Sequence, residues 1–436
     1  MLSTASARKT LNLVPTILKA GYATAVAKTG NGIKVAALEE NSKTASVSLV
    51  INAGARFEPK DKAGISHFVK NFGFKNNGKR SAFRITRETE LLGGVLSSSL
   101  GRENIVFTAE CMKEDVPYFV EVFGDMVTKT KFAEHEMHGV HEEIVAECTR
   151  AESTPVIAIL DAAHAVAFRS GLGNSIYAAA YSSVEPSDLK AFAANNFVGN
   201  KIALVATGVS EAELKDLAAS SFANIPAGGS AASSAAKYHG GDIRVPHGTS
   251  EGHIAVAFEG AAAGTADFYK AQVLRALLGG ERFVKWSTSG VSPLSTISSK
   301  AGKDVEVAAF NFGYSDAGLF GLYVKAGNAE VGNVAKAAVD ALKAASKTVS
   351  AEELTRAVNQ AKFEVASAYE TRQGAIELLS AQALKGEKVS VSEALTALDN
   401  VSSADVSKFA AKVLASKPTT VVLGQTATLP YGDSLF

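Results

Sequence analysis

Two runs of apolar residues near the start of the chain predict β-strands. Residues Ile33 to Leu38 and Ala45 to Ala53 are rich in β-branched and small apolar side chains, as buried or half-buried strands are. The polar turn Asn41-Ser42-Lys43 separates the two runs. We therefore expect a β-hairpin over residues 33–53.

The segment that follows alternates between helical and strand patterns. Its apolar spacing predicts short helices first, then two strands after the Gly93-Gly94 break, and then three longer helices. The predicted helices are Lys62 to Phe74, Arg84 to Leu92, Glu114 to Thr128, Ala133 to Arg150 and Pro155 to Phe168, and the predicted strands are Val95 to Leu100 and Asn104 to Glu110.

A change in composition divides the chain into two parts. Residues 227–248 are dense in Gly, Ala and Ser and lack apolar periodicity, which is typical of a linker. After them the order begins again, with a strand at His253 to Phe258 and a helix at Ala266 to Leu278. We therefore predict domains at residues 28–226 and 249–436.

An internal repeat supports two copies of one domain. Met137 aligns with Leu354 and Glu147 with Glu364, and both pairs have the same separation (364 − 147 = 217), so one strand-helix-helix unit recurs without a gap. Mixed strands and helices in this order predict an α+β fold, with a sheet packed against helices in each half.

The first residues have the composition of a targeting segment. Basic residues occur among Ser and Thr, and no acidic residue precedes Glu39. Such a pattern resembles a mitochondrial presequence, which we predict over residues 1–27, and an ordinary unstructured terminus is the alternative. The basic residues in question are Arg8, Lys9, Lys19, Lys28 and Lys34.

Composition and charge exclude several classes of protein. Hydrophobic residues make up 47% of the chain, and 44 basic residues balance 44 acidic ones, so the chain can bury large cores but carries no net field that would favour nucleic acid. No stretch reaches the roughly 18–20 apolar residues that cross a bilayer. Cys111 and Cys148 are too few for a disulfide framework, and we interpret them as packed thiols.

The segment Gly64 to Ala82 resembles the metal-binding helix of the pitrilysin-type metallopeptidases, whose signature is His-x-x-Glu-His. The five residues here are His67-Phe68-Val69-Lys70-Asn71. In that family the two His side chains hold zinc, the Glu activates a water molecule, and a Glu on a later helix is the third ligand. The matching later position is Glu147, 76 residues after Asn71 (147 − 71 = 76).

The resemblance covers nearly the whole chain after the first residues. Ala53 to Glu58 stands where the family has a small-residue turn with a Glu, and Lys62 to Phe68 matches the approach to the first ligand. It implies two homologous pitrilysin-like domains, each with a mainly antiparallel sheet packed with helices, that together form a bowl.

The departures from the signature predict that the site is inactive. Lys70 replaces the general base with a cation that has no free lone pair, and Asn71 replaces an imidazole with an amide, which binds zinc poorly. Only His67 and Glu147 remain, fewer than the three protein ligands of a catalytic zinc site. We therefore expect these four residues to be degenerate remnants, with no catalytic residue, bound metal or cofactor.

Two other clusters invite a functional interpretation, and a structural one is preferred for each. His135, His138 and His141 share one predicted helix, but the surrounding Glu residues indicate a solvated face rather than a metal site. The pair Gly279-Gly280 lacks the rest of a phosphate-binding pattern and suits a helix C-cap.

The family includes the subunits of the mitochondrial processing peptidase and the core subunits of ubiquinol-cytochrome c oxidoreductase, respiratory complex III. The segment Leu278 to Ala301 has one Gly pair and lacks the long glycine-rich loop of the non-catalytic α subunit of the peptidase. It resembles the core subunits in Phe283-Val284-Lys285, Ser287 to Ser292 and Leu294-Ser295. The α subunit remains the alternative.

The resemblance to core subunits implies a structural role without catalysis, supporting the assembly and stability of complex III in respiratory electron transport. It also implies a peripheral position on the matrix side of the mitochondrial inner membrane. The partners it implies are the paralogous core protein 1, cytochrome b, cytochrome c1 and the iron-sulfur subunit, and no nucleic acid.

Overall fold

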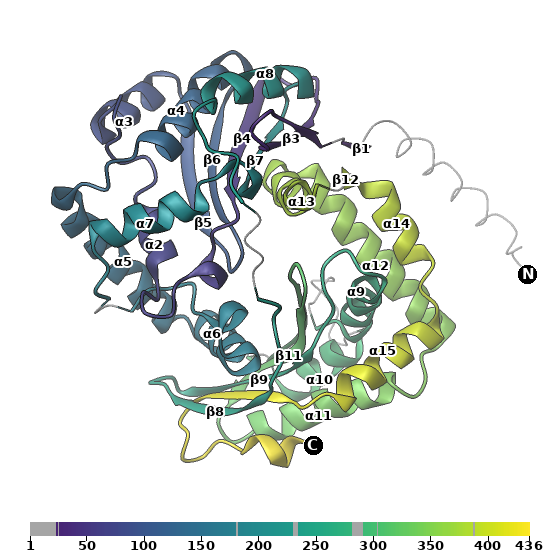
Figure 1. The fold of residues 1–436 in the computed structure, drawn as a ribbon. Coiled ribbons are helices and arrows are strands. Elements are labelled where there is room, and N and C mark those ends of the chain that lie inside the picture. The colour runs from purple at the N-terminus through teal and green to yellow at the C-terminus, as the bar shows by residue number, and fades with distance from the viewer. Residues whose placement is uncertain are drawn as a thin grey trace, which may run out of the picture.

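The computed structural model describes residues 23–24, 26–179, 182–229, 234–280, 291–302, 304–386 and 389–436. Its two larger sheets, one in each half of the chain, are packed with helices, and the halves curve toward each other around a common centre (Figure 1). Nearly all neighbouring strands are antiparallel, so the predicted α+β fold with mainly antiparallel sheets is confirmed.

The sheet of the first half has six strands in the order β2-β3-β7-β4-β6-β5, and only β3 and β7 pair in parallel. The strands are β2 (Ala27–Lys28), β3 (Lys34–Leu38), β4 (Thr44–Ile51), β5 (Val95–Leu100), β6 (Ile105–Met112) and β7 (Ile202–Thr207). The predicted hairpin is wrong, because β7 lies between β3 and β4, and Leu204 pairs with both Val35 and Leu49. Strand β7 is buried at every position, and nothing in the local pattern of residues 33–53 reveals that a distant strand separates them.

The sheet of the second half has five strands in the order β10-β11-β9-β13-β8. The strands are β8 (Gly241–Pro246), β9 (Glu251–Glu259), β10 (Glu306–Gly313), β11 (Gly318–Gly327) and β13 (Thr419–Gly424). Strand β8 falls inside the range 227–248 predicted as linker. As a partly exposed edge strand, β8 lacks the apolar alternation that would have identified it.

A third, two-stranded pairing joins the start of the described chain to the second half, since β1 (Ala23–Thr24) pairs with β12 (Val389–Ser390). Strand β1 and the first residue of β2 lie within the range 1–27 predicted as a presequence. Most of that range lies outside the described residues. The presequence and the domain limits 28–226 and 249–436 stay predictions.

Helices cover the six-stranded sheet of the first half and enclose its main core. The helices of this half are α2 (Ile65–Asn71), α3 (Ala82–Leu91), α4 (Val116–Lys129), α5 (Glu134–Ser153), α6 (Pro155–Phe168), α7 (Pro186–Asn196) and α8 (Glu211–Ser221). Phe68, Phe72, Phe107, Phe119 and Phe123 are fully buried in this core. Rings of this size dominate the burial that stabilises the half.

Glu58 fixes where helix α2 begins. Its carboxylate accepts hydrogen bonds from the backbone N–H of Gly64 (2.8 Å) and Ser66 (3.1 Å) and from the Ser66 hydroxyl. Gly64 has a φ of 86°, which a residue with a side chain rarely adopts, so the helix cannot extend back to Lys62 as predicted. Burial raises the pKa of Glu58, although its three hydrogen bonds oppose that rise.

The second half has a similar set of helices. They are α9 (Ala266–Leu278), α10 (Pro293–Ala301), α11 (Val331–Ala345), α12 (Ala351–Glu370), α13 (Arg372–Lys385), α14 (Val391–Asp399) and α15 (Ser403–Ala415). Gly279 is the C-cap of α9 with a φ of 67°, as its sequence context predicted. Cys111 and Cys148 are buried free thiols, in agreement with the sequence.

Each half completes the core of the other. Helix α13 of the second half packs on the six-stranded sheet, with Leu379 and Ala383 against Val205, and helix α6 of the first half packs on the five-stranded sheet, with Ile159 and Phe168 in that cluster (Figure 1). These apolar contacts bind the halves together, so neither sheet is covered by its own half alone.

A buried arginine adds a polar link between the halves. Arg56 donates to both carboxylate oxygens of Asp316 (2.7 and 2.6 Å), to Glu103 (2.8 Å) and to the carbonyl of Ser234 (3.1 Å), and only 3% of its side chain is exposed. Asp316 lies in the turn between β10 and β11, whereas Glu103 lies in the turn between β5 and β6. One guanidinium therefore joins both halves and the segment between them.

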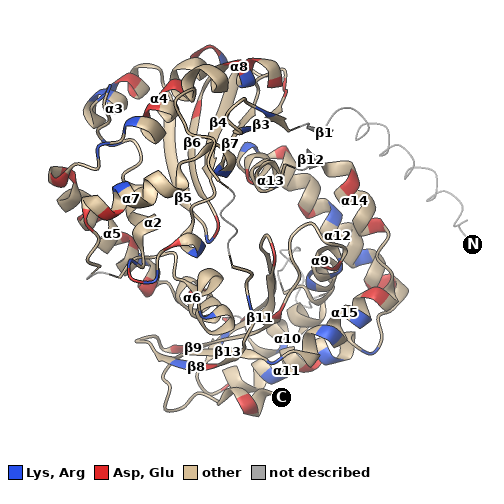
Figure 2. Ribbon diagram, in the orientation of Figure 1, with Lys and Arg blue, Asp and Glu red and all other residues tan. Residues whose placement is uncertain are grey.

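Charged residues of both signs are interspersed along the helices of both halves, as Figure 2 shows. Within the described part of the chain, no helix combines the length and the apolar character that spanning a membrane requires.

Candidate functional site

The four residues predicted as remnants of a metal site lie on two helices that pack against each other. His67, Lys70 and Asn71 are on α2, and Glu147 is on α5. Phe68 of α2 and Ile144 of α5 face the main core, which sets the rotation of both helices. This packing brings Glu147 to His67 and Lys70, as the spacing predicted.

The three polar side chains form a compact hydrogen-bonded cluster. His67 Nε2 is 2.5 Å from Glu147 Oε2, and Lys70 Nζ is 2.7 Å from each carboxylate oxygen of Glu147. The backbone N–H of Ala178 donates to His67 Nδ1 (3.2 Å). Since Nδ1 accepts, the proton of the neutral imidazole sits on Nε2 and is donated to Glu147.

The charges of this cluster follow from its surroundings. Burial lowers the pKa of His67, and the charge of Lys70 adds to the effect against the opposing influence of Glu147. Burial alone would raise the pKa of Glu147, but hydrogen bonds from His67 and Lys70 outweigh it, so the pKa lies below its ordinary value. Near neutral pH the cluster is therefore a neutral imidazole, an ammonium and a carboxylate.

These residues do not fit a zinc ion. The Lys70 ammonium contacts both oxygens that would bind the metal, and the His67 nitrogen nearest the carboxylate carries a proton. Asn71, one turn after His67, is 9% exposed, and its Nδ2 finds no hydrogen-bond partner among the described residues. Throughout the described ranges, no group of three His, Cys, Asp or Glu side chains is placed to hold a metal.

A pocket of about 250 Å³ borders the cluster. Two of its polar residues, Arg150 and Tyr177, were not predicted as site residues. Arg150 is three residues after Glu147 and so shares its helix face, a signal that could have identified it. Tyr177 follows α6 in a loop and offered no such signal. The lining residues are His67, Lys70, Leu100, Glu147, Arg150, Ala151, Ile157, Ile176 and Tyr177.

The second half contains a counterpart of this cluster. Glu364 of α12 is ion-paired with Arg275 of α9, and Gln360 donates to the same carboxylate (3.3 Å). Among the described residues, no imidazole is hydrogen-bonded to Glu364. The repeat that aligned Glu147 with Glu364 thus places a carboxylate against a cation of the neighbouring helix in both halves.

The three histidines of α5 have separate partners. His138 Nε2 is 3.3 Å from Glu142, His135 lies 3.4 Å from the amide nitrogen of Asn76, and the ring of His141 faces Phe68. His138 is 87% exposed, which agrees with the solvated face preferred from the sequence.

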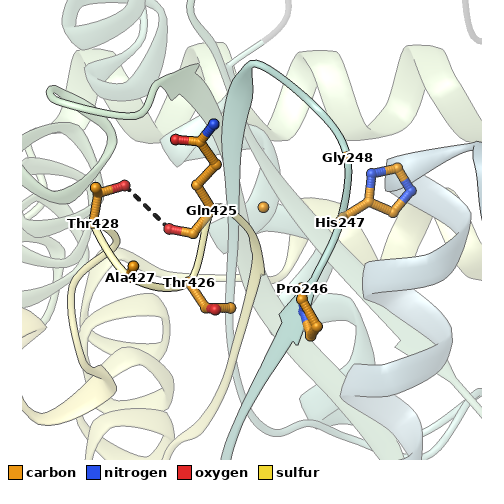
Figure 3. Close-up of a pocket in the computed structure, with 8 residues that line it drawn as sticks. Pro246, His247, Gly248, Gln425, Thr426, Ala427 and Thr428 are labelled. Atoms are coloured by element: carbon orange, nitrogen blue, oxygen red, sulfur yellow. Dashed lines mark hydrogen bonds between the residues drawn. The ribbon is translucent and has the colours of Figure 1, made fainter.

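A larger cavity of about 510 Å³ lies at one end of the five-stranded sheet (Figure 3). Residues Pro246 to Gly248 and Gly424 to Thr428 line it, and the Thr428 hydroxyl donates to the carbonyl of Gln425 within the second of these segments (3.1 Å). His247 is the one ionisable residue in this lining, and its Nε2 contacts the carbonyl of Glu152 (3.0 Å). A lone, already bonded imidazole gives no acid-base or nucleophilic pairing.

Comparison with known proteins identifies both halves. Residues 34–180 match the family described as Insulinase (Peptidase family M16), and residues 183–361 match the Peptidase M16 inactive domain. The second match begins before β7, which nevertheless pairs within the sheet of the first half.

Several curated relatives cover almost the whole chain. A protein of Neurospora crassa is 38% identical over 93% of this chain and 89% of its own length. Relatives from Rattus norvegicus and Homo sapiens are 32% and 31% identical, each over 94% of this chain and 91% of their own length. All three bear the name cytochrome b-c1 complex subunit 2, mitochondrial. The segment 281–290, which contains part of the predicted core-subunit likeness, lies outside the described residues. The chain therefore belongs to the insulinase family, peptidase family M16, and within it to the group of mitochondrial cytochrome b-c1 complex subunit 2 proteins.

Proposed function

We propose that this chain is a non-catalytic core subunit of the mitochondrial cytochrome b-c1 complex, in which it supports the assembly and stability of the complex. The observation that carries the proposal is the Lys70–Glu147 ion pair, which occupies the place of a peptidase zinc site in a chain whose relatives bear that name. Electron transfer is then a property of the assembly, and no cofactor is bound by this chain.

The ion pair argues against a peptidase role on chemical grounds. Peptide hydrolysis by this family needs a carboxylate to deprotonate zinc-bound water, and Lys70 supplies an ammonium held by Glu147 instead. Removing that ammonium from Glu147 to admit a metal would leave a mostly buried charge without its partner, since 11% of the Lys70 side chain is exposed. We therefore propose that His67, Lys70, Asn71 and Glu147 hold no metal.

The proposed location is the matrix side of the mitochondrial inner membrane, with the chain attached peripherally and imported by a presequence at residues 1–27. The absence of a membrane-spanning helix from the described residues is compatible with attachment through other subunits. The proposed partners are core protein 1, cytochrome b, cytochrome c1 and the iron-sulfur subunit. The chain balances 44 basic residues against 44 acidic ones, so it carries no net positive charge to attract nucleic acid.

A native gel of mild-detergent mitochondrial extract tests the proposal. The chain is expected to migrate with the cytochrome b-c1 complex. Elemental analysis of the purified complex is expected to find no zinc bound by this chain. The control is a complex carrying the Lys70→Gln variant, which removes the ammonium but restores no ligand. Migration only as a small soluble heterodimer that cleaves presequence peptides would instead identify the α subunit of a processing peptidase.

A further inference from the structure

Strand β8 presents an open hydrogen-bonding edge. It pairs in parallel with β13 on one side, where Gly241 N–H donates to the carbonyl of Pro418 (3.0 Å) and His247 N–H to that of Gly424 (3.1 Å). In a parallel pair, alternate residues of a strand make the bonds, so the backbone groups of Asp242 and Arg244 point away from β13. No described residue hydrogen-bonds to those backbone groups.

The side chains along β8 are also incompletely covered. Ile243 is 40% exposed, and its register with Val421 places it on the sheet face that α6 covers. Arg244 does not guard the edge, because its guanidinium donates to the carbonyl of Leu429 (2.7 Å) and stacks over the Tyr431 ring at 4.0 Å. An edge strand with free backbone groups and an exposed apolar residue is a template for another strand.

The corresponding strand of the first half is covered. Strand β3 pairs in parallel with β7 just as β8 does with β13, but β2 pairs antiparallel to its other side, with Ala27 opposite Val35 and Lys28 opposite Lys34. The other edge of the five-stranded sheet also has a neighbour, since Ala309 of β10 donates to the carbonyl of Gly279 (3.2 Å). Within the part of the chain that the structure describes, strand β8 thus lacks the antiparallel cover that its counterpart in the repeat has.

We propose that β8 binds an extended segment of a neighbouring polypeptide as an antiparallel sixth strand. The inference rests on the proposed function, because the assembly supplies the neighbour. The segment accepts hydrogen bonds from the N–H groups of Asp242 and Arg244 and donates to their carbonyls. Its side chains alternate, with apolar residues against Ile243 and Val245 on the α6 side and polar residues on the other.

The polar side of the bound segment carries a basic residue near Asp242. The carboxylate of Asp242 lies close enough to Asp433 for the two charges to interact, and the nearby Arg244 is already bonded to carbonyls. Burial raises the pKa of Asp242; the charge of Arg244 opposes this rise, and the charge of Asp433 adds a smaller rise. A lysine or arginine in the added strand would lie beside the carboxylates of Asp242 and Asp433, which attract it.

Amide hydrogen exchange tests the inference, with the isolated chain compared with the chain in the purified cytochrome b-c1 complex. The amides of Asp242 and Arg244 are expected to exchange at least tenfold more slowly in the complex, while those of Ile243 and Val245 are protected in both samples because they face β13. Unchanged exchange in an assembled complex would overturn the inference and leave the proposed function intact. Absence of the chain from the complex would overturn both.

Two further results separate the occupants. Protection that appears in the isolated chain as its concentration rises would identify a second copy of this chain and contradict the proposal. The matched variants Asp242→Pro and Asp242→Ala then test the backbone bond itself, because proline removes the outward N–H but no bond to β13. In the complex, Asp242→Pro is expected to speed exchange of the Arg244 amide by tenfold or more, whereas Asp242→Ala, which keeps the N–H and loses only the attraction of the carboxylate for the basic residue, is expected to speed it much less. Equal behaviour of the two variants would contradict the added strand.

Discussion

Glu147 and Glu364 occupy equivalent positions in the two halves, and each carboxylate is paired with a cation from the neighbouring helix. Lys70 of α2 meets Glu147 of α5, and Arg275 of α9 meets Glu364 of α12. In each half the ion pair joins the first α-helix after β4 or β9 to a twenty-residue α-helix of the same repeat unit. Glu147 therefore has a structural use that requires no metal.

Replacing Glu147 with Gln should destabilise the chain. The change keeps the shape of the side chain but leaves the Lys70 ammonium, which is 11% exposed, without a counter-charge. Because a third of the Glu147 side chain reaches solvent, we expect a loss of about 1–3 kcal/mol rather than the full cost of a buried charge. Urea unfolding at pH 7 measures it.

The control for this substitution lies on the same helix. Glu142 is 71% exposed and, among the described residues, is ion-paired only with His138, so Glu142→Gln should leave the unfolding midpoint unchanged. Equal midpoints for Glu147→Gln and the parent would mean that the ion pair contributes nothing to stability.

Restoring the lost groups should restore zinc binding. In the double variant Lys70→Glu and Asn71→His, a second imidazole stands one helical turn from His67, and the cation that contacts Glu147 is gone. We expect about one zinc per chain by elemental analysis after dialysis. The single variant Asn71→His keeps the ammonium and should remain metal-free. A double variant that binds no more zinc than the parent would argue against the placement of the motif.

Much of the site followed from the sequence, since the ligand spacing of the family located Glu147 and the chemistry of Lys70 and Asn71 predicted its inactivity. Helices and strands with clear periodicity also appeared where expected. The insertion of β7 between β3 and β4 was missed because it depends on pairing between distant segments. The packing of α6 on the sheet of the second half, and of α13 on the sheet of the first half, was missed for the same reason. An apolar helix face does not reveal which sheet will cover it.

The guanidinium of Arg56 should not be replaceable by an ammonium. Arg56→Lys keeps the charge but cannot bond to Asp316 with two parallel N–H groups while also reaching Glu103. We expect a loss of about 1–3 kcal/mol in the free energy of unfolding, from lost hydrogen bonds to charged groups. Arg84→Lys is the control, because Arg84 is 59% exposed and its one ion pair with a described residue is with Glu88 on its own helix. Equal losses for the two variants would show that the link between the halves is no stronger than a surface pair.

His164 should make the chain sensitive to acid. On α6 its Nδ1 donates to the carbonyl of Leu160 (2.7 Å), and its Nε2 accepts from the Tyr314 hydroxyl (2.7 Å) in the turn after β10. Burial, aided by the charge of Arg102, lowers the pKa of His164 to about 3. Protonation at Nε2 would reverse the hydrogen bond with Tyr314, whose oxygen would then accept, and would place a buried charge between α6 and the five-stranded sheet.

The direction of the pH effect follows from this lowered pKa. Between about pH 6.5 and 3 the unfolded chain binds a proton at this residue and the folded chain does not, so the contribution of His164 is complete above pH 6.5 and declines as the pH falls. At pH 5 the decline is about 2 kcal/mol, from roughly 1.4 kcal/mol per pH unit.

Other groups titrate in the same range, so the measured quantity is the difference between the parent and His164→Gln in urea unfolding at pH 7 and pH 5. The variant should be less stable than the parent at pH 7 but lose about 2 kcal/mol less on acidification, whereas His138→Gln, at an exposed position, should match the parent at both pH values. If His164→Gln and the parent showed the same pH dependence, the prediction would fail. The His164 imidazole of the folded parent would then be charged or solvated where α6 meets the five-stranded sheet, and its pKa would not be lowered.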